Sequence, residues 1–549
     1  MSGGRRKPID VSSQWRPRSA HVDEAIRAVR GSGVLPPLRT LMDATTGRPR
    51  YLSVEALLVG MMLNGLTPGH RALISRIAAA MGSLSTQRLR ELGCRVDRPP
   101  ADLYKRVDAL YNHLCRTLAA GHDVEVDGRT VPLDDVWFAN RIGISTVGDA
   151  SRLSRAVAMD GTAMHTAATL SGERVVVDGE ATGRGGRAKE RLQPRDVGAD
   201  GRNVYTADPD ARAGYKTATS RDRASTYVGY ELHLAVLTRE VVWTDGIAGI
   251  ALGPPVPGLI VTSALSPANT HRAEHIVPAL LEHAPHVTDV VVDPGYSLTR
   301  PETFALPLRR AGVHVTFRIT THQETTRPFS ANAFILNGQL FSETLPARLR
   351  KLPLPPTVSD ASAKHTSEDD WNEAARYRFT LHGRMQPDGT IRLRDPIHAG
   401  RLRAAVLPRS LGRGRHLPRV TVPDPDGWTG TVTVAATDLP LQSRYVTGTT
   451  AHRIAYFSRR QIVESANGAL QHTYTRIRSG HHRVFRTHKI QTLLAFTIAG
   501  YNADRLKEWR RQHGTEPDLP HQPALEDDEF DWDDALDPDV TPAGTDPPA

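Results

Sequence analysis

The chain has 549 residues, 39% of them hydrophobic, and no apolar run approaches the roughly 20 residues that a membrane span needs. Its start, Met1–Lys7, lacks the apolar segment of a secretory signal, and two cysteines, Cys94 and Cys115, are too few for a disulfide framework or a four-cysteine zinc site, so we expect a cytoplasmic protein. The net charge of +9 favours a polyanion such as nucleic acid as the partner.

The N-terminal part of the chain is predicted to be helical. We expect a basic flexible arm over 1–20 and a helical DNA-binding domain over 21–150. Apolar periodicity predicts helices over 54–65 and 72–81, with a break at Thr67-Pro68-Gly69-His70 between them. Two short helices joined by such a turn resemble a helix-turn-helix, and they equally fit an ordinary helical hairpin in a small bundle.

From about residue 150 the pattern changes to strands that alternate with helices. The order strand, helix, strand over 287–319 argues for a parallel βαβ unit, and the apolar run Val290–Val292 is consistent with burial on both faces. The fold class is therefore α/β. We predict strands over 157–164, 227–237, 259–263, 287–292 and 313–319, helices over 273–283 and 302–311, and a loop over 171–203.

Residues 321–455 have a different composition, rich in Pro, Arg and Thr, and are expected to be β-rich. The pair Asp388-Gly389 is a hairpin signal within this region. A long helical tract is expected to follow over 459–511. Short strands are predicted near 375–381, 390–393 and 430–434.

The C-terminal tail, residues 512–549, is acidic and expected to be disordered. From residue 516 onward it contains 12 Asp and Glu, seven prolines and no Lys or Arg. Taking these 12 negative charges away from a chain of net charge +9 leaves +21 on residues 1–515. The body of the protein is thus more basic than the whole chain suggests, which strengthens the expectation of a nucleic-acid partner.

Two aspartates each stand at the end of an apolar run. Asp160 follows Ala156–Met159 and precedes Gly161-Thr162, and Asp293 follows Val290–Val292 and precedes Pro294-Gly295-Tyr296. Open α/β sheets bind ligands at the carboxyl ends of their strands, and a buried acid is costly unless it is paired or binds a metal. The alternative interpretations, which involve no ligand, are a turn cap at Asp160 and a helix cap at Asp293. Asp127, followed by Gly128, competes with Asp160 for the role but looks like a simple hairpin turn.

Glu464 lies in the predicted C-terminal helical tract, four residues after Arg460. Alone, this pair reads as a surface salt bridge of little energetic weight. Together with the two strand-end aspartates, however, Glu464 completes the oxygen ligands that a pair of Mg²⁺ ions needs for phosphoryl displacement. In such a site we expect Arg460 to contact a DNA phosphate. The other candidate DNA-binding residues are Arg459, Arg476, Arg478, Arg483, Arg486 and Lys489.

The segment Asp208-Pro209-Asp210-Ala211-Arg212 forms a further cluster of charge. It reads either as a turn or as a group that supports the site or binds phosphate. His233 is expected to pack at a sheet edge rather than to take part in catalysis. The sequence contains no Gly-rich phosphate loop with Lys-Ser/Thr, no Gly-x-Ser-x-Gly and no zinc spacing, so we expect no nucleotide cofactor and no serine-hydrolase chemistry.

These motifs together resemble the DDE transposases of bacterial insertion sequences. The resemblance is carried by Asp160-Gly-Thr, Asp208-Pro-Asp-Ala-Arg, Gly229-Tyr-x-x-His, Asp293-Pro-Gly-Tyr and Arg459-Arg-x-x-x-Glu464. It implies a ribonuclease-H-like mixed sheet flanked by helices, with the catalytic domain over 151–320 and 456–511 and a β-rich insertion over 321–455. It further implies that Asp160, Asp293 and Glu464 are the catalytic, metal-binding triad.

The same resemblance implies the activity. A transposase cleaves DNA and transfers strands at the ends of its own insertion sequence (DNA transposition and recombination), with Mg²⁺ or Mn²⁺ and two ions per site. Its partners would be double-stranded DNA, at the element ends and at the target, and a second copy of the chain in a synaptic homodimer, in the bacterial cytoplasm at the nucleoid. The family's Tyr-x-x-Arg-x-x-x-Glu-x-x-x-x-x-x-Lys pattern keeps Arg460 and Glu464 but places Phe457 and Gln471 at its ends. The alternatives are a transposase-derived DNA-binding protein that no longer cuts and a metal-dependent nuclease without strand transfer.

Overall fold

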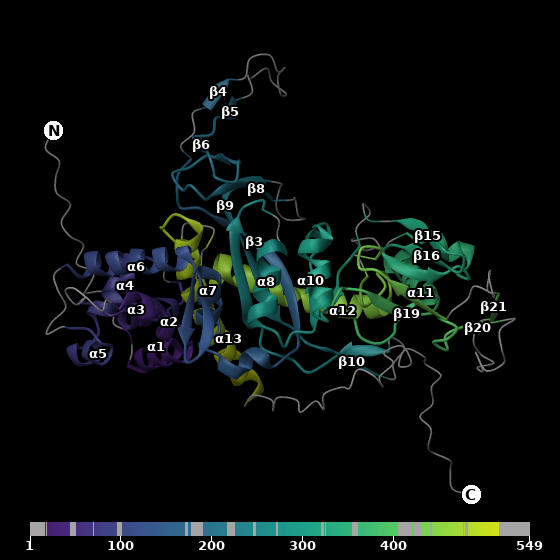
Figure 1. The fold of residues 1–549 in the computed structure, drawn as a ribbon, viewed down its shortest axis with the longest axis horizontal. Helices are drawn as coiled ribbons and strands as arrows, with labels where there is room; N and C mark the ends of the chain where they lie inside the picture. The colour runs from purple at the N-terminus through teal and green to yellow at the C-terminus, as the bar shows by residue number, and fades with distance from the viewer. Residues whose placement is uncertain are drawn as a thin grey trace, which may run out of the picture.

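The structure is a computed structural model in which three regions lie side by side: a helical bundle at one end, a mixed sheet in the middle and a second group of sheets at the other end (Figure 1). Most of the expected N-terminal arm, Arg476, Arg478 and the acidic tail from residue 515 onward lie outside the described residues. The structure describes residues 17, 19–43, 51–69, 71–95, 102–170, 174–176, 190–216, 225–244, 249–270, 273–319, 323, 325–353, 361–404, 419–421, 430–439, 442–475, 477 and 481–514.

The helical bundle confirms the predicted helices over 54–65 and 72–81. Its central helix, α3, starts at Ser53, whose hydroxyl caps the Ala56 N–H at 3.0 Å, and every residue of this helix is buried. A helix that is apolar all round belongs in a core, so the α3–α4 pair is an internal hairpin of the bundle. The elements are α1 (Ser19–Gly31), α2 (Leu35–Met42), α3 (Val54–Gly65), α4 (Ile74–Gly82), α5 (Thr86–Glu91), α6 (Leu103–Ala120), the hairpin β1 (His122–Val126) and β2 (Arg129–Leu133), and α7 (Asp135–Gly143).

The last helix of the described chain, α13 (Thr487–His513), completes this bundle from the other end of the sequence (Figure 1). Its residues Leu493, Phe496 and Ala499 belong to the same apolar core as α3. The two helices meet at glycines, because a Cβ added at Gly500 would collide with the carbonyl oxygen of Gly65. Residues of α13 therefore share one core with the N-terminal helices.

The central sheet has the strand order β12-β9-β3-β13-β14. Strands β12, β9 and β3 pair antiparallel, whereas β3, β13 and β14 pair parallel, which confirms the predicted parallel unit over 287–319. Strand β8 pairs with the first residues of the long strand β9. The strands are β3 (Ala156–His165), β8 (Arg212–Lys216), β9 (Ser225–Leu237), β12 (Ile260–Pro267), β13 (Asp289–Val292) and β14 (His314–Thr316).

Helices cover both faces of this sheet, and alternate strand residues divide between the two cores. Val157 and Met159 pack toward α8 (Ala273–His283) and α10 (Ala305–Arg310), while Ala158, between them in sequence, packs toward α12 (Thr450–Gly468) and α13. This explains why the strands read as unbroken apolar runs. Short helical segments complete the layers: a 3₁₀ turn over Gly148–Arg152, α9 (Pro294–Ser297), a 3₁₀ turn over Pro301–Thr303 and a π-helical turn over Ala469–Thr473 that continues α12.

The third region, between β14 and α12, contains two three-stranded antiparallel sheets, and the predicted hairpin at Asp388-Gly389 connects β18 to β19. It also contains helix α11 (Ala361–Ala375), which the sequence did not predict, and the strand expected near 375–381 shrinks to two residues. The strands are β15 (Thr326–Ser330), β16 (Ala333–Leu336), β17 (Gln339–Ser342), β18 (Thr380–Leu381), β19 (Ile391–Arg394) and β22 (Thr431–Val434), with a 3₁₀ turn over Ala347–Lys351.

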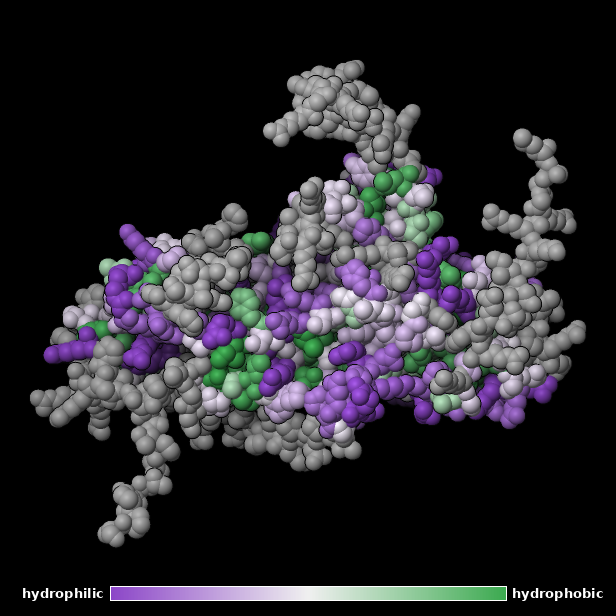
Figure 2. All heavy atoms as spheres, turned by 180° about the vertical axis from the view of Figure 1, so that it is seen from behind, coloured by the Kyte–Doolittle hydropathy of each residue, from purple (hydrophilic) through white to green (hydrophobic). Residues whose placement is uncertain are grey.

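The remaining strands form small two-stranded pairs outside the main sheet. Some of these strands lie in the described parts of residues 171–203, where the sequence predicted a loop. None of the described helices is long and apolar enough to cross a bilayer. Seen from behind, hydrophilic side chains cover much of the described surface, with apolar side chains in separate patches between them (Figure 2). The pairs are β4 (Arg174–Val176) with β5 (Glu190–Leu192), β6 (Asp196–Val197) with β7 (Asn203–Val204), β10 (Val241–Trp243) with β11 (Ile250–Leu252), and β20 (Arg403–Ala404) with β21 (Arg419–Val420).

Candidate active site

Asp160 and Asp293 lie on neighbouring parallel strands of the central sheet. Met159 and Val292 are register partners, and each aspartate is the residue that follows its member of this pair. Asp293 also caps α9, since its Oδ1 accepts from the Gly295 N–H at 2.7 Å. Asp293 therefore does cap a helix, as the alternative interpretation held, and its Oδ2 stays available for another partner. Asp127, by contrast, lies in the two-residue turn between β1 and β2 with φ +49°, as the hairpin pattern predicted.

Arg460 connects Glu464 to Asp293 at the end of β13. The Arg460 guanidinium lies 2.8 Å from Asp293 Oδ2 with one terminal nitrogen and 3.0 Å from Glu464 Oε1 with the other. The pair at i and i+4 is therefore more than a surface salt bridge, because the same guanidinium also binds a strand-end acid. Its side chain is only 25% exposed.

Asp160 is the most perturbed acid of the site. Burial, and after it the charge of Asp293, raises the pKa of Asp160 to about 7, against the lowering effects of Arg460 and of the Gly161 N–H. Its Oδ2 accepts from Asn467 Nδ2 at 3.1 Å and its Oδ1 from the Gly161 N–H at 2.8 Å. An acid whose pKa is raised by burial and by a second carboxylate at a strand end marks a candidate functional site.

One face of α12 and of the π-helical turn after it runs along β3. Residues 460, 464, 467 and 471 are spaced three or four apart, which places them on the same side of the helix. The last of them, Gln471, donates a hydrogen bond to Thr162 on β3. Sequence reasoning missed Asn467 and gave Gln471 only as a departure from the family pattern. Both residues could have been identified from their spacing of three and seven residues after Glu464, which places them on the same face of the helix.

The carboxylates do not converge as a ready metal cage. Among the residues that the structure describes, no group of three or more His, Cys, Asp and Glu side chains is arranged to hold a metal ion. Arg460 instead supplies the positive charge between Asp293 and Glu464. The donor types still suit a hard cation, because Asp160, Asp293 and Glu464 offer carboxylate oxygens.

A buried histidine supports the Asp293 loop. His233 Nδ1 lies 3.0 Å from the hydroxyl of Tyr296, the last residue of the Asp293-Pro-Gly-Tyr motif, and its Nε2 lies 3.3 Å from Ser266 Oγ. His233 is in the middle of the sheet, between β3 and β12, and not at an edge as expected. Gly161 makes room for it, because an added Cβ there would lie 3.0 Å from His233 Nδ1.

Arg459 does not face DNA, which corrects its prediction as a DNA-binding residue. Its side chain is fully buried, with Nη1 2.6 Å from Asp289 Oδ2 and Nε donating to the Ala455 carbonyl at 2.6 Å. Burial by itself would raise the pKa of Asp289, but the Arg459 and Arg444 guanidinium groups outweigh it and hold that pKa below its usual value. Arg459 therefore fastens α12 to β13, one residue away from the Arg460 that faces the site.

The Asp208-Pro-Asp210 cluster anchors the start of α13, which decides between its two interpretations in favour of a structural turn. Asp208 Oδ1 accepts from the Arg486 N–H and Asp210 Oδ2 from the Thr487 N–H, both at 2.9 Å. Asp208 Oδ2 in turn accepts from the hydroxyls of Tyr230 and Thr166, each at 2.8 Å. These bonds satisfy backbone N–H groups that a helix start leaves unpaired.

The other predicted DNA-binding residues lie at or before the start of α13. Arg483 and Arg486 are exposed, and Lys489 is half-buried with Nζ 2.5 Å from Asn112 Oδ1. Arg476 and Arg478 lie outside the described residues. Comparison of the chain with protein families, with curated proteins and with solved structures gives no match.

Proposed function

We propose that the protein is a DDE-type transposase with a ribonuclease-H-like catalytic domain over 151–320 and 456–511 and a β-rich insertion over 321–455. The observation that carries the proposal is the position of Asp160 and Asp293 side by side across the parallel pair β3 and β13, with Glu464 on a helix packed against the same sheet. Asp293 directly follows β13, whereas Asp160 lies within β3, which continues to His165. The resemblance to insertion-sequence transposases implies this arrangement. In the sequence, Asp293 and Glu464 are 171 residues apart.

Asp160, Asp293 and Glu464 would hold Mg²⁺ or Mn²⁺, which when bound neutralises the charge of a phosphodiester and activates the attacking oxygen. The protein's own groups prepare that site. Asn467 and the Gly161 N–H orient the Asp160 carboxylate, and the His233–Tyr296 pair holds the α9 turn that carries Asp293. Arg460 is placed to exchange one of its two carboxylate partners for a DNA phosphate, which its planar guanidinium fits equally well.

The proposed partner is double-stranded DNA, both at the ends of the element and at the target, in the bacterial cytoplasm. The basic body of the chain supplies sequence-independent attraction for it. Cleavage and strand transfer both proceed by in-line displacement at phosphorus, so one site serves both steps, and a synaptic homodimer would bring two ends together.

The test is Mg²⁺-dependent cleavage of DNA that carries the element ends. Asp293→Asn keeps the size of the side chain but removes its charge, and we expect it to abolish cleavage while DNA affinity stays within about two-fold. Asp123→Asn, an exposed acid on β1, is the matched control and should cleave like the parent. Cleavage by Asp293→Asn at the parental rate would refute the proposal. A parent protein that binds but never cuts would instead be a transposase-derived DNA-binding protein, and cutting without strand transfer would make it a nuclease.

A further inference from the structure

Asn467 has an unused oxygen atom beside the acids of the candidate active site. Its amide Nδ2 donates to Asp160 Oδ2 at 3.1 Å, whereas its Oδ1 is buried and has no hydrogen-bond partner among the described residues. The residue as a whole is 7% exposed. Leaving a buried carbonyl oxygen without a partner is unfavourable, so this atom calls for an explanation.

The nearby guanidinium does not satisfy this oxygen. Arg460 lies on the same face of α12 as Asn467, but its two terminal nitrogens go to Asp293 at 2.8 Å and to Glu464 at 3.0 Å. The Glu464 side chain is 50% exposed and held by Arg460. Asn467, three residues further along the chain, is the residue of α12 that is hydrogen-bonded to Asp160.

A second hydrogen bond fixes the position of Asn467 relative to Asp160. Gln471, four residues after Asn467, donates to Thr162 Oγ1, two residues after Asp160. Residues two apart on a strand share a face, and so do residues four apart on a helix. We therefore expect the helix to keep its place on β3 when the Asn467 side chain is changed.

An amide oxygen beside a carboxylate oxygen is a ligand pair for a hard cation. Mg²⁺ and Mn²⁺ prefer carboxylate and carbonyl oxygens. A turn of the Asn467 amide about its last bond exchanges the oxygen and the nitrogen, which have nearly the same shape, and brings Oδ1 next to Asp160 Oδ2. Together with Asp293 on the neighbouring strand, three side chains then offer oxygen atoms without any movement of the helix.

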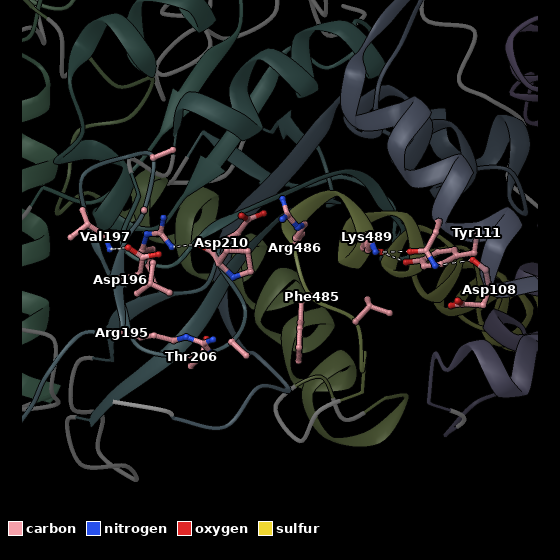
Figure 3. Close-up of a pocket in the computed structure, with 18 residues that line it drawn as sticks. Asp108, Tyr111, Arg195, Asp196, Val197, Thr206, Asp210, Phe485, Arg486 and Lys489 are labelled. Atoms are coloured by element: carbon pink, nitrogen blue, oxygen red, sulfur yellow. Dashed lines mark hydrogen bonds between the residues drawn. The ribbon is translucent and has the colours of Figure 1, made fainter. Parts of the chain in front are cut away.

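The groove between the helical bundle and the sheet offers no comparable set of ligands. This groove, of about 830 Å³, lies between α6, residues 195–212 and the start of α13 (Figure 3). It contains three carboxylates and, apart from Arg212, which pairs with Asp200, three cations. One of its acids, Asp210, already accepts from the Thr487 N–H at 2.9 Å. Its charges are balanced, so it does not favour a cation.

We propose that the amide oxygen of Asn467 is a ligand of the divalent cation that Asp160 binds. The cation takes the place of the hydrogen bond from Asn467 Nδ2 to Asp160 and satisfies the unpaired Oδ1 at the same time. Because the amide is neutral, it adds a ligand without adding a fourth negative charge to the three acids. The proposal rests on the proposed function, which assigns a metal to those acids, and deepens it by one further ligand.

Binding of Mn²⁺ to the full chain without DNA, measured by isothermal titration calorimetry, tests this proposal. Asn467→Leu keeps the size of the side chain but has no oxygen, and it should weaken Mn²⁺ binding by about ten-fold or more. Asn467→Asp keeps an oxygen at the same place and should bind Mn²⁺ at least as tightly as the parent. Parental Mn²⁺ affinity in Asn467→Leu would overturn the proposal.

A sulfur ligand distinguishes direct metal contact from a role in orienting Asp160. Asn467→Cys places a thiol beside Asp160, and since thiolates favour Zn²⁺ over Mn²⁺, the ratio of Zn²⁺ to Mn²⁺ affinity should rise by about ten-fold or more. Ser458→Cys, at an exposed position of the same helix, is the matched control and should keep the parental ratio. A parental ratio in Asn467→Cys, in a protein that melts like the parent, would show that Asn467 only orients Asp160.

The outcomes also separate this proposal from the transposase proposal. A raised Zn²⁺ preference in Asn467→Cys, with a parent that never cleaves end-containing DNA, would uphold Asn467 as a ligand and overturn the transposase activity. Cleavage by the parent with an unchanged metal preference in Asn467→Cys would overturn the role of Asn467 alone. A parent that binds no Mn²⁺ at concentrations up to about 10 mM would also overturn the role of Asn467.

Discussion

Arg460 donates a hydrogen bond to Asp293 at 2.8 Å across 167 residues of sequence. Since the same guanidinium lies 3.0 Å from Glu464, the strand-end acid and the helix acid share one cation that the chain itself provides. A bound metal ion or a phosphate would compete with this arrangement. Arg460 thus holds the two acids together, and under the proposed function the same guanidinium would bind a DNA phosphate.

Arg460→Lys tests this double role. A lysine ammonium is a point charge that does not bridge two carboxylates with a planar fork. We expect Mg²⁺-dependent cleavage to fall by about ten-fold or more, which corresponds to roughly 1.4 kcal/mol of transition-state stabilisation. Single-turnover cleavage rates measure it, with circular dichroism to check the fold. Arg453→Lys, two turns earlier on α12, is the control, and an Arg460→Lys protein as active as this control would contradict the role.

The raised pKa of Asp160 predicts a pH-dependent stability. Its pKa is about 7 in the folded protein, whereas an aspartate in an unfolded chain titrates near about 3.9, so the folded state keeps a proton that the unfolded chain releases. The stabilising effect of that proton is complete below about pH 4 and is lost as the pH rises to about 7. Asp160→Asn should therefore be more stable than the parent at pH 8, by up to about 4 kcal/mol, and not at pH 4. Urea unfolding at both pH values measures this, and an equal effect at both would rule out Asp160 as the titrating group.

The buried ion pair between Arg459 and Asp289 predicts a large cost for removing one partner alone. Arg459→Met leaves Asp289 with only Arg444, 3.6 Å away, and should lower the free energy of unfolding by about 3–5 kcal/mol. The double variant Arg459→Met/Asp289→Leu should recover most of this loss, because the buried carboxylate is then removed together with its Arg459 partner. Chemical denaturation of the two variants provides the comparison. A single variant that costs less than about 1 kcal/mol would show that the pair is not buried as described.

The contact between α3 and α13 predicts opposite effects of alanine at two helical glycines. Gly500→Ala places a methyl group against the Gly65 backbone and should destabilise by about 2 kcal/mol or more, because backbone atoms cannot move aside. Gly468→Ala, where an added Cβ meets nothing within 4 Å, should stabilise by about 0.5–1 kcal/mol. Thermal melts of the two proteins measure the difference. Equal melting temperatures would mean that α13 does not pack against α3.

The two aspartates could be predicted because their signal is local. An apolar run that ends in an acid predicts a strand end, which is right for Asp293 after β13 and wrong for Asp160, because β3 continues to His165. The parallel pairing of the two strands still sets the two acids side by side. The roles of Arg459 and Arg460 could not be separated in this way. The two residues are adjacent and differ by about a third of a helical turn, so only the position of the sheet decides which one is buried.

Contacts between residues far apart in sequence explain some of the other differences between the predicted and the observed structure. Asp208 caps a helix 278 residues later, and no pattern near Asp208 indicates where that helix starts. The predicted helix over 459–511 is interrupted before α13, where Arg486 takes a positive φ and its N–H donates to Asp208. Helix α11 was missed because its sequence, Ala361–Ala375, is mostly polar and lacks a clear apolar stripe.

The place of α13 in the N-terminal bundle has a consequence for how the protein is made. Leu493, Phe496 and Ala499 are among the last residues of the described chain to leave the ribosome, yet they complete the core around α3. Until then the first helices expose to solvent the apolar surface that α13 covers, for nearly the whole of synthesis. Folding of the bundle is therefore expected to be post-translational and to need chaperone protection. An isolated fragment of residues 1–150 should aggregate rather than fold.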